Sequence, residues 1–294
     1  KKIILTFLFT GVSFLLNAQN SDTLNSDSVS YRYGLIGIGP ISQKITFLSP
    51  VKYSGLTFNR EIGSYKLKNK KITSSFLYSN IGYSSNHTSG TNENEPLALS
   101  LLSADPIILI NYGYLFNRRY RVNENKLPKN FPLFSIGWSY WMDYGSDIKY
   151  KNVNNILYYN FSNMAGISVG LQKRIKTKKM QLDISNEFTS PLFGIYSASE
   201  FGLPVPYTVL SEDAKIWKHL DVGSFETNFQ FKNNLNFDFK IRSKKNNDVN
   251  TLRLQYGVNN TNLRLNNNQK VQVIHSFKFS YLFISFSYIN ITLY

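Results

Sequence analysis

The chain has 294 residues, no cysteine, three histidines and a formal net charge of +15, and 15% of its residues are aromatic. A chain of this length can form one large domain or two smaller ones, and the lack of cysteine excludes a scaffold held together by disulfides. Because histidine is scarce as well, the composition predicts neither a metal site nor a cofactor.

The chain opens with KKIILTFLFTGVSFLLNAQN, which has the layout of a secretory signal peptide. Two lysines precede an apolar run from Ile3 to Leu16, and the small residue Ala18 offers a cleavage point. The run is too short for a helix that spans a membrane. We therefore predict a signal peptide over residues 1–18, a flexible periplasmic leader over 19–30 and one folded domain over 31–294.

From Tyr31 onward, apolar and polar residues alternate in short segments, as they do in β-strands. Beyond the signal peptide there is no run of about 18 apolar residues, so a closed barrel is the only predicted route into a bilayer. The pattern predicts an all-β fold, a transmembrane antiparallel up-and-down β-barrel of about twelve strands, each long enough to span. The predicted strands are 31–39, 53–62, 72–83, 107–117, 133–145, 158–172, 179–189, 223–232, 235–243, 251–258, 271–280 and 282–294.

A hairpin over residues 163–188 shows the two faces that such strands present. Its first strand sets Ala165, Ile167 and Val169 against small or polar residues, and a run of cations follows. The strand at 133–145 has the same pattern. In a barrel the apolar face lies on lipid and the small polar face lies in the lumen.

The connections between these segments differ in length, and their lengths predict which way the barrel faces. Long outer loops, short inner turns and an even strand number are typical of outer-membrane barrels. The predicted outer connections are 40–52, 84–106, 146–157, 190–222, 244–250 and a tight link near Tyr281. The predicted periplasmic connections are 63–71, 118–132, 173–178, Asn233–Asn234 and 259–270.

The chain ends in FISFSYINITLY, an alternating segment whose last residue is Tyr294. This segment resembles the C-terminal strand of Gram-negative outer-membrane β-barrel proteins, which carries a terminal aromatic residue. The resemblance implies a location in the outer membrane, contact with its lipid, and insertion by the barrel assembly machinery through the last strand. It is a resemblance to an architecture and names no functional family.

Cations gather in three predicted periplasmic turns. One hypothesis is that they meet anionic lipid headgroups, which stabilises binding by about 1 kcal/mol each. The other is that they dock an acidic periplasmic partner, such as another envelope protein; nucleic acid is not expected, because the chain lacks any recognition fold. The residues are Lys66, Lys68, Lys70, Lys71, Arg118, Arg119, Arg121, Lys126, Lys129, Lys173, Arg174, Lys176, Lys178 and Lys179.

Charged residues also fall on the predicted inward faces. They would line a polarised narrow pore or fill the lumen with ion pairs, because twelve strands lie between the filled barrels of about eight strands and the open barrels of sixteen or more. The residues are Glu61, Asp143, Asp183, Glu187, Glu226, Asp238, Lys240, Arg242, Arg253 and Lys278.

One pair of residues suggests catalysis. In His87-Thr88-Ser89 the histidine could act as general base for the serine. The pair resembles the His-x-Ser-Asn motif of outer-membrane lipid A deacylases, although Gly90 stands where that family has Asn. His219 is predicted to be a solvated loop residue.

The sequence therefore predicts a non-enzymatic outer-membrane barrel, foremost a narrow channel or porin-like conduit for small polar solutes. The first alternative is an accessory or scaffold barrel in a larger outer-membrane complex. The second is a lipid A deacylase-like hydrolase that uses His87 and Ser89.

Overall fold

The alternating segments form long antiparallel strands in the computed structural model, which describes residues 28–46, 48–49, 51–68, 70–85, 106–122, 132–149, 157–176, 180–198, 221–224, 227–242, 249–265 and 268–286. The strands are β1 (Ser28–Ile45), β2 (Tyr53–Lys68), β3 (Lys71–Ser85), β4 (Ile107–Arg121), β5 (Leu133–Lys149), β6 (Leu157–Lys176), β7 (Met180–Ala198), β8 (Asp221–Ser224), β9 (Asn228–Arg242), β10 (Val249–Leu265) and β11 (Asn268–Phe286). The predicted signal peptide, residues 19–27 of the predicted leader and the terminal residue Tyr294 lie outside the described residues, whereas residues 28–30 of the predicted leader form the start of β1.

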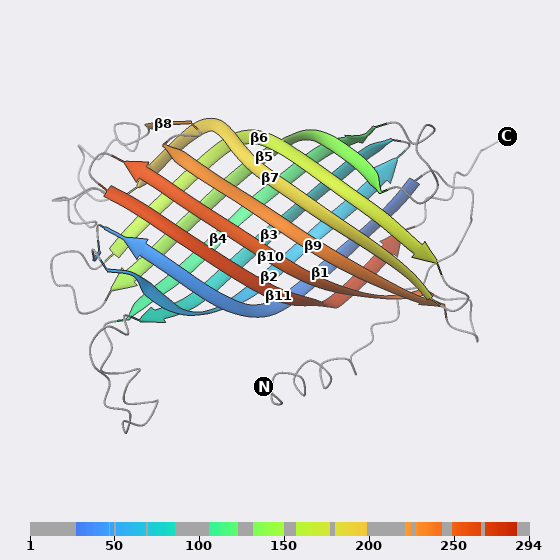
Figure 1. The fold of residues 1–294 in the computed structure, drawn as a ribbon, viewed down its shortest axis with the longest axis horizontal. Coiled ribbons are helices and arrows are strands. Elements are labelled where there is room, and N and C mark those ends of the chain that lie inside the picture. The colour runs from blue at the N-terminus through green and yellow to red at the C-terminus, as the bar shows by residue number, and fades with distance from the viewer. Residues whose placement is uncertain are drawn as a thin grey trace, which may run out of the picture.

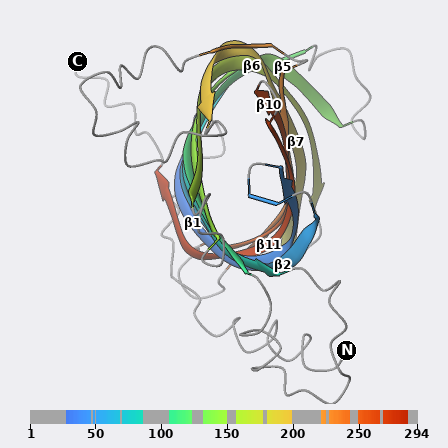
Figure 2. The same cartoon turned by 90° about the vertical axis from the view of Figure 1, so that its left-hand side faces the viewer.

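Ten of these strands close into a barrel. The strand order is β6-β5-β4-β3-β2-β1-β11-β10-β9-β7-β8, and a further pairing of β6 with β7 joins the two sides of the sheet. The short β8 pairs with one end of β7 and is not part of the ring. The strands run obliquely around the barrel, whose cross-section is oval (Figures 1 and 2).

The faces of the strands follow the predicted alternation. On β5, Trp138 and Met142 are exposed on the outside, whereas Ser139 and Asp143 are buried on the inside. The first strand of the 163–188 hairpin, in β6, has Ile167 exposed outside and its small polar face buried inside. Along these strands the outer face is therefore largely apolar and the inner face largely polar, although buried apolar clusters such as Phe76, Leu115 and Trp141 also lie inside.

The predicted count of twelve strands is wrong, because two predicted breaks lie inside continuous strands. Asn233 and Asn234 lie in the middle of β9, where Asn234 pairs with Gly257 on one side and with Glu187 on the other. Tyr281 lies within β11 at a register shift opposite Gly34 and Leu35. Segments 223–232 and 235–243 therefore contribute mainly to one strand, and 271–280 and the described part of 282–294 both belong to β11.

The two missing breaks change which end of the barrel some connections occupy. One end, here called the basic end, carries the connections after β2, β4, β6 and β9, together with the start of β1 and the end of β11. The other, the long-link end, carries the connections after β1, β3, β5, β7 and β10, including the long stretches 86–106 and 199–220. The connection between β9 and β10 is therefore at the same end as the connection between β6 and β7, although 244–250 and 173–178 were predicted on opposite sides. Likewise, the connection between β10 and β11 is at the same end as the connection between β1 and β2, although 259–270 and 40–52 were predicted on opposite sides.

The described residues form no α-helix, so the described part of the chain contains no helix long and apolar enough to cross a membrane.

Candidate functional site

The interior of the barrel is the most polar region of the molecule, because the inward face of every strand carries polar or charged side chains. The acidic side chains described on the ten barrel strands all point inward. They are Glu61, Asp143, Asp147, Asp183, Glu187 and Asp238. A buried charge is stable only when it is paired and hydrogen-bonded, so each needs a partner inside the barrel.

Two carboxylates lie near the middle of the barrel. Glu61 on β2 accepts a hydrogen bond from Lys278 on β11 at 2.7 Å and another from the Tyr33 hydroxyl at 3.0 Å. Asp143 on β5 accepts one from the Tyr78 hydroxyl at 2.8 Å. The Glu61–Lys278 and Asp143–Tyr78 contacts join strands that are not neighbours in the sheet, so they brace the barrel wall from within.

Lys232 reaches across this middle layer. Its ammonium nitrogen lies 2.8 Å from the centroid of the Tyr78 ring and 5.4 Å from that of the Trp141 ring. Lys232 lies on β9 and Tyr78 lies on β3. Four strands separate β9 from β3 in either direction around the ring: β10, β11, β1 and β2 on one side, and β7, β6, β5 and β4 on the other. The two strands are therefore opposite each other, and this cation–π contact spans the lumen.

The basic end is closed by a second layer of ion pairs. Arg253 donates to both oxygens of Asp238, at 2.6 and 2.7 Å, and also to the Tyr31 hydroxyl at 2.7 Å. Arg119 pairs with Glu187 at 2.6 Å. In addition, Asp183 accepts contacts from Arg174 at 2.9 Å and from Lys240 at 3.1 Å.

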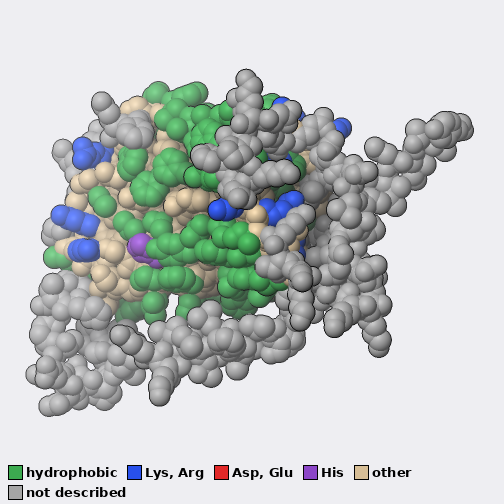
Figure 3. Space-filling model, turned by 45° about the vertical axis from the view of Figure 1, so that its right-hand side comes forward, with side chains coloured by type: hydrophobic (Ala, Val, Ile, Leu, Met, Phe, Trp, Pro, Cys, Tyr) green, Lys and Arg blue, Asp and Glu red, His purple; other side chains and the backbone are tan. Residues whose placement is uncertain are grey.

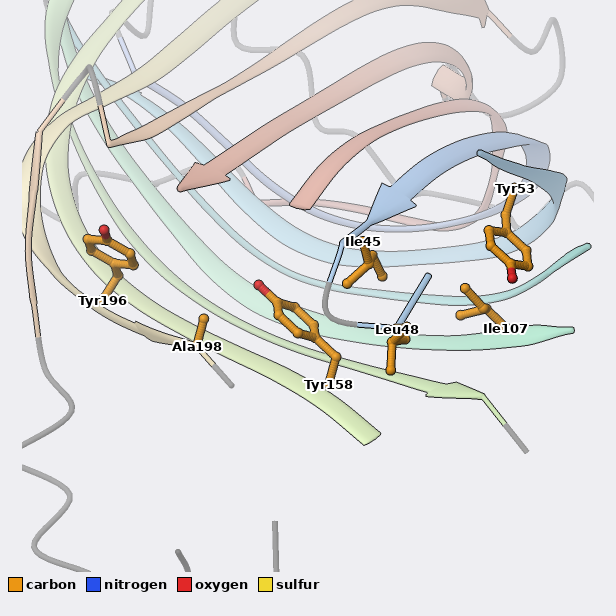
Figure 4. Packing of buried hydrophobic residues seen from close by; sticks show 7 residues of the cluster. All are labelled: Ile45, Leu48, Tyr53, Ile107, Tyr158, Tyr196 and Ala198. Carbon is orange, nitrogen blue, oxygen red and sulfur yellow. The ribbon is translucent and has the colours of Figure 1, made fainter. Parts of the chain in front are cut away.

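A third layer fills the long-link end. Lys270 on β11 donates to Asp147 on β5 at 2.6 Å and to Asn160 at 3.0 Å, and this ion pair also joins opposite strands. The connection after β1 turns into the opening, where Leu48 is buried and accepts a hydrogen bond from Lys149 at its carbonyl (Figure 2). Around Leu48 pack apolar side chains from several strands: Ile45, Tyr53, Ile107, Tyr158, Tyr196 and Ala198 (Figure 4).

Little space is left between these layers. Three cavities between inward-facing side chains have volumes of about 20, 60 and 10 Å³. Since a water needs about 10–15 Å³ of such space, these three hold a few waters at most. A further space of about 330 Å³ is lined mainly by outward-facing residues, although the inward-facing Tyr78 and Asp143 also border it. The side-chain layers therefore fill most of the lumen around these three cavities.

The structure places most of the predicted lumen residues inside the barrel. Glu61, Asp143, Asp183, Glu187, Asp238, Lys240, Arg253 and Lys278 point inward, Glu226 lies outside the described residues, and the side chain of Arg242 is not among those described. The prediction missed Arg119, Asp147, Lys149, Lys232 and Lys270. The same alternation could have found Lys232, which is flanked by outward-facing Phe231 and Asn233.

The predicted basic turns are largely parts of strands. Lys66 and Lys68 end β2, Lys71 begins β3, Arg118, Arg119 and Arg121 lie on β4, and Lys173, Arg174 and Lys176 lie on β6. Lys70 is in the short turn between β2 and β3, whereas Lys126, Lys129, Lys178 and Lys179 lie outside the described residues. Arg119 belongs to the lumen, because its side chain is 2% exposed and paired with Glu187.

The catalytic hypothesis is not tested, because His87, Ser89 and His219 lie outside the described residues. His275 faces outward and its Nδ1 lies 2.8 Å from the Tyr256 hydroxyl, while its neighbour Ser276 is buried inside. Within the described ranges no group of three or more metal-ligating side chains comes together.

Comparison with known proteins identifies no relative. No family model and no curated protein matches the chain. Among solved structures, the crystal structure of Pseudomonas aeruginosa OccK9 (OpdG) is 9% identical and aligns with 86% of this chain and 98% of that chain, at a TM-score of 0.16. The closed barrel is therefore established by its own strand pairing.

Proposed function

We propose that the chain is an integral outer-membrane β-barrel that is closed to solutes and serves as a non-enzymatic accessory subunit of an envelope complex. Its outer wall supports the membrane location. Exposed apolar side chains follow one another around the barrel, among them Ile38, Leu56, Leu77, Trp138 and Phe277. On the side drawn in Figure 3 the described surface is broadly hydrophobic and no acidic side chain is visible.

The observation that carries the closed state is the pair of contacts between opposite walls. Lys270 with Asp147, and Lys232 with the Tyr78 ring, each tie together strands on opposite sides of the ring. A barrel of ten strands is near the size whose interior side chains can fill. The third layer, around Leu48, covers the long-link end.

A closed barrel contributes through its surfaces, which is why an accessory role is favoured over a conduit. Exposed cations lie on the described strands at the basic end, including Lys66, Lys68 and Lys173. The predicted partners are anionic lipid or an acidic envelope protein on that side. Insertion by the barrel assembly machinery through the last strand stays part of the proposal.

Planar-bilayer recording of the purified, detergent-folded protein tests the closed state. We expect no current steps at voltages that open general porins, while the same preparation shows a heat-modifiable shift on a gel. Reproducible steps from folded protein would overturn the closed state and favour the porin-like conduit. The accessory role is tested by isolating the protein from its own membrane with and without the cations of 173–179 neutralised.

A further inference from the structure

The outer wall contains one charged side chain that a lipid-facing surface does not easily tolerate. Arg60 lies at the middle of β2, points outward and is exposed. The outward neighbours on its own strand are Phe58 and Ile62, both exposed apolar residues. The other outward-facing cations described on the barrel strands lie close to strand ends, so Arg60 alone among them is surrounded by the apolar belt.

The residues beside Arg60 on neighbouring strands show the same surroundings. Its register partners are Ile36 on β1 and Ser79 on β3, and the row continues through Tyr112 on β4 to Tyr144 on β5. The nearest outward cation toward the basic end is Arg32 on β1, whose register partner on β2 is Ser64, four residues from Arg60. At about 3.3 Å per residue and a tilt of about 40°, that separation corresponds to a depth of about 10 Å, and the six residues to Lys66 on β2 itself to about 15 Å.

A groove with a volume of about 330 Å³ lies in the wall next to Arg60. Leu77, Met142 and Phe161 contribute apolar surface to it, and the stacked rings of Tyr112 and Tyr144, with centroids 5.0 Å apart, line it as well. Two inward-facing residues, Tyr78 and Asp143, line the inner side of the groove. The groove thus combines apolar and aromatic surface with the Arg60 guanidinium group and, on its inner side, the Asp143 carboxyl group, which accepts a hydrogen bond from Tyr78.

Three kinds of occupant could neutralise Arg60. A second copy of this chain does not fit, because the described outward faces of the barrel carry no acid and a symmetric contact would bring two Arg60 side chains together. A lipid phosphate lies at the headgroup level, far from the middle of the belt. A carboxylate on a protein segment within the membrane has the right charge and can lie at the right depth.

We propose that this groove over β2–β6 docks an apolar, membrane-embedded segment of another envelope protein, which presents one Asp or Glu to Arg60. The inference rests on the proposed accessory function and names the chemistry of one partner. Arg60 provides the polar anchor, and Leu77, Met142 and Phe161 pack against the apolar residues of that segment.

The first test is the stability of the isolated barrel in phosphatidylcholine vesicles, where no partner is present. Because Arg at the bilayer midplane is unfavourable, we expect Arg60→Leu to raise the folding equilibrium constant about 30- to 700-fold, equivalent to about 2–4 kcal/mol. Arg264→Leu, an outward arginine at the end of β10, is the control and should change it about fivefold or less. If Arg60→Leu changes the constant no more than the control does, Arg60 is not in the hydrocarbon and the proposal fails.

The second test is photo-crosslinking in intact cells, with a benzoyl-phenylalanine at Leu77 and, as a control, at Phe277 on the outer face of β11. We expect a protein adduct at Leu77 only, mapped to an apolar segment that contains an acid. Arg60→Glu should reduce it at least about tenfold, and replacing that acid with Arg should restore it. An adduct to lipid, an adduct to a second copy, an adduct insensitive to Arg60→Glu, or none at all would overturn the proposal.

The two proposals can fail separately. A silent bilayer recording without an Arg60-dependent adduct leaves the closed accessory barrel standing and rejects this groove. Current steps from folded protein reject the closed barrel, whatever the adducts show.

Discussion

Lys270 and Asp147 form the most deeply buried ion pair described in the barrel, with side-chain exposures of 1% and 0%. Lys270→Ala would leave the Asp147 carboxylate buried without its cation, and breaking a buried pair this way destabilises by about 3–5 kcal/mol. We therefore expect urea unfolding of Lys270→Ala in detergent or vesicles to show a loss of that size.

Two further variants distinguish the loss of stability caused by breaking the ion pair from the loss caused by removing the lysine methylene groups. Lys270→Met with Asp147→Leu removes both charges, so stability should return to within about 1–2 kcal/mol of the native value. Lys44→Ala removes an exposed lysine from the outer face of β1 and should change stability by about 0.5 kcal/mol or less. Equal losses for Lys270→Ala and the double variant would show that the pair contributes no coupling.

Arg253 and Arg264 lie on the same strand and face opposite sides, which makes them a matched pair. Arg253 is buried and holds both oxygens of Asp238, whereas Arg264 is exposed on the outside. We expect Arg253→Gln to lower the free energy of unfolding by about 3–5 kcal/mol and Arg264→Gln to leave it nearly unchanged. Adding Asp238→Asn to Arg253→Gln should recover much of the loss, and a failure to do so would argue against the buried pair.

The alternation of single residues separated the two faces of the clearest strands, and the barrel interpretation then predicted which of those faces is inside, but neither predicted where β9 and β11 end. Asn233 and Asn234 are a common turn pair, and their neighbours gave no reason to doubt a break. In a barrel the inward face is polar, so an inward Asn such as Asn234 does not interrupt a strand. At Tyr281 the register shift changes the alternation, which hid the continuity of β11.

The continuity of β9 has a direct test. Asn234 lies in the interior of the sheet, paired on both sides, and proline there removes a backbone donor from the ladder. Each unsatisfied backbone group inside a membrane costs several kcal/mol, so Asn234→Pro should prevent formation of the compact band on an unheated gel. Asn246→Pro, in the connection between β9 and β10, should be tolerated; the same tolerance at Asn234 would restore a turn at that place.

The contacts that fill the barrel could not be predicted from the sequence, because they depend on its closed shape. Lys232 and Tyr78 are 154 residues apart in sequence, and only the number of strands and their stagger bring them face to face. The filled lumen and the polarised pore were predicted from the same charged residues. The filled lumen is favoured because ten strands bring these residues into contact across the barrel. Arg119, Asp147 and Lys270 were missed as lumen residues for a related reason: they lie just beyond the predicted spans, and the longer strands carry the inward face further.

The orientation of the whole barrel gives the last prediction. If the long-link end faces the outside, as the sequence predicts, a single cysteine at Asn92 should react with an impermeant reagent in intact cells, whereas one at Thr177 should not. Ser197 does not serve this test, because the structure buries it on β7. A barrel of twelve strands would put Asn246 on the outside, but ten strands put its connection at the same end as Thr177. We therefore expect Asn246→Cys to stay unlabelled in intact cells and to react after the outer membrane is opened. Labelling of Asn246→Cys together with Asn92→Cys would contradict the ten-stranded topology, and labelling of Thr177→Cys and Asn246→Cys alone would keep that topology and reverse the orientation.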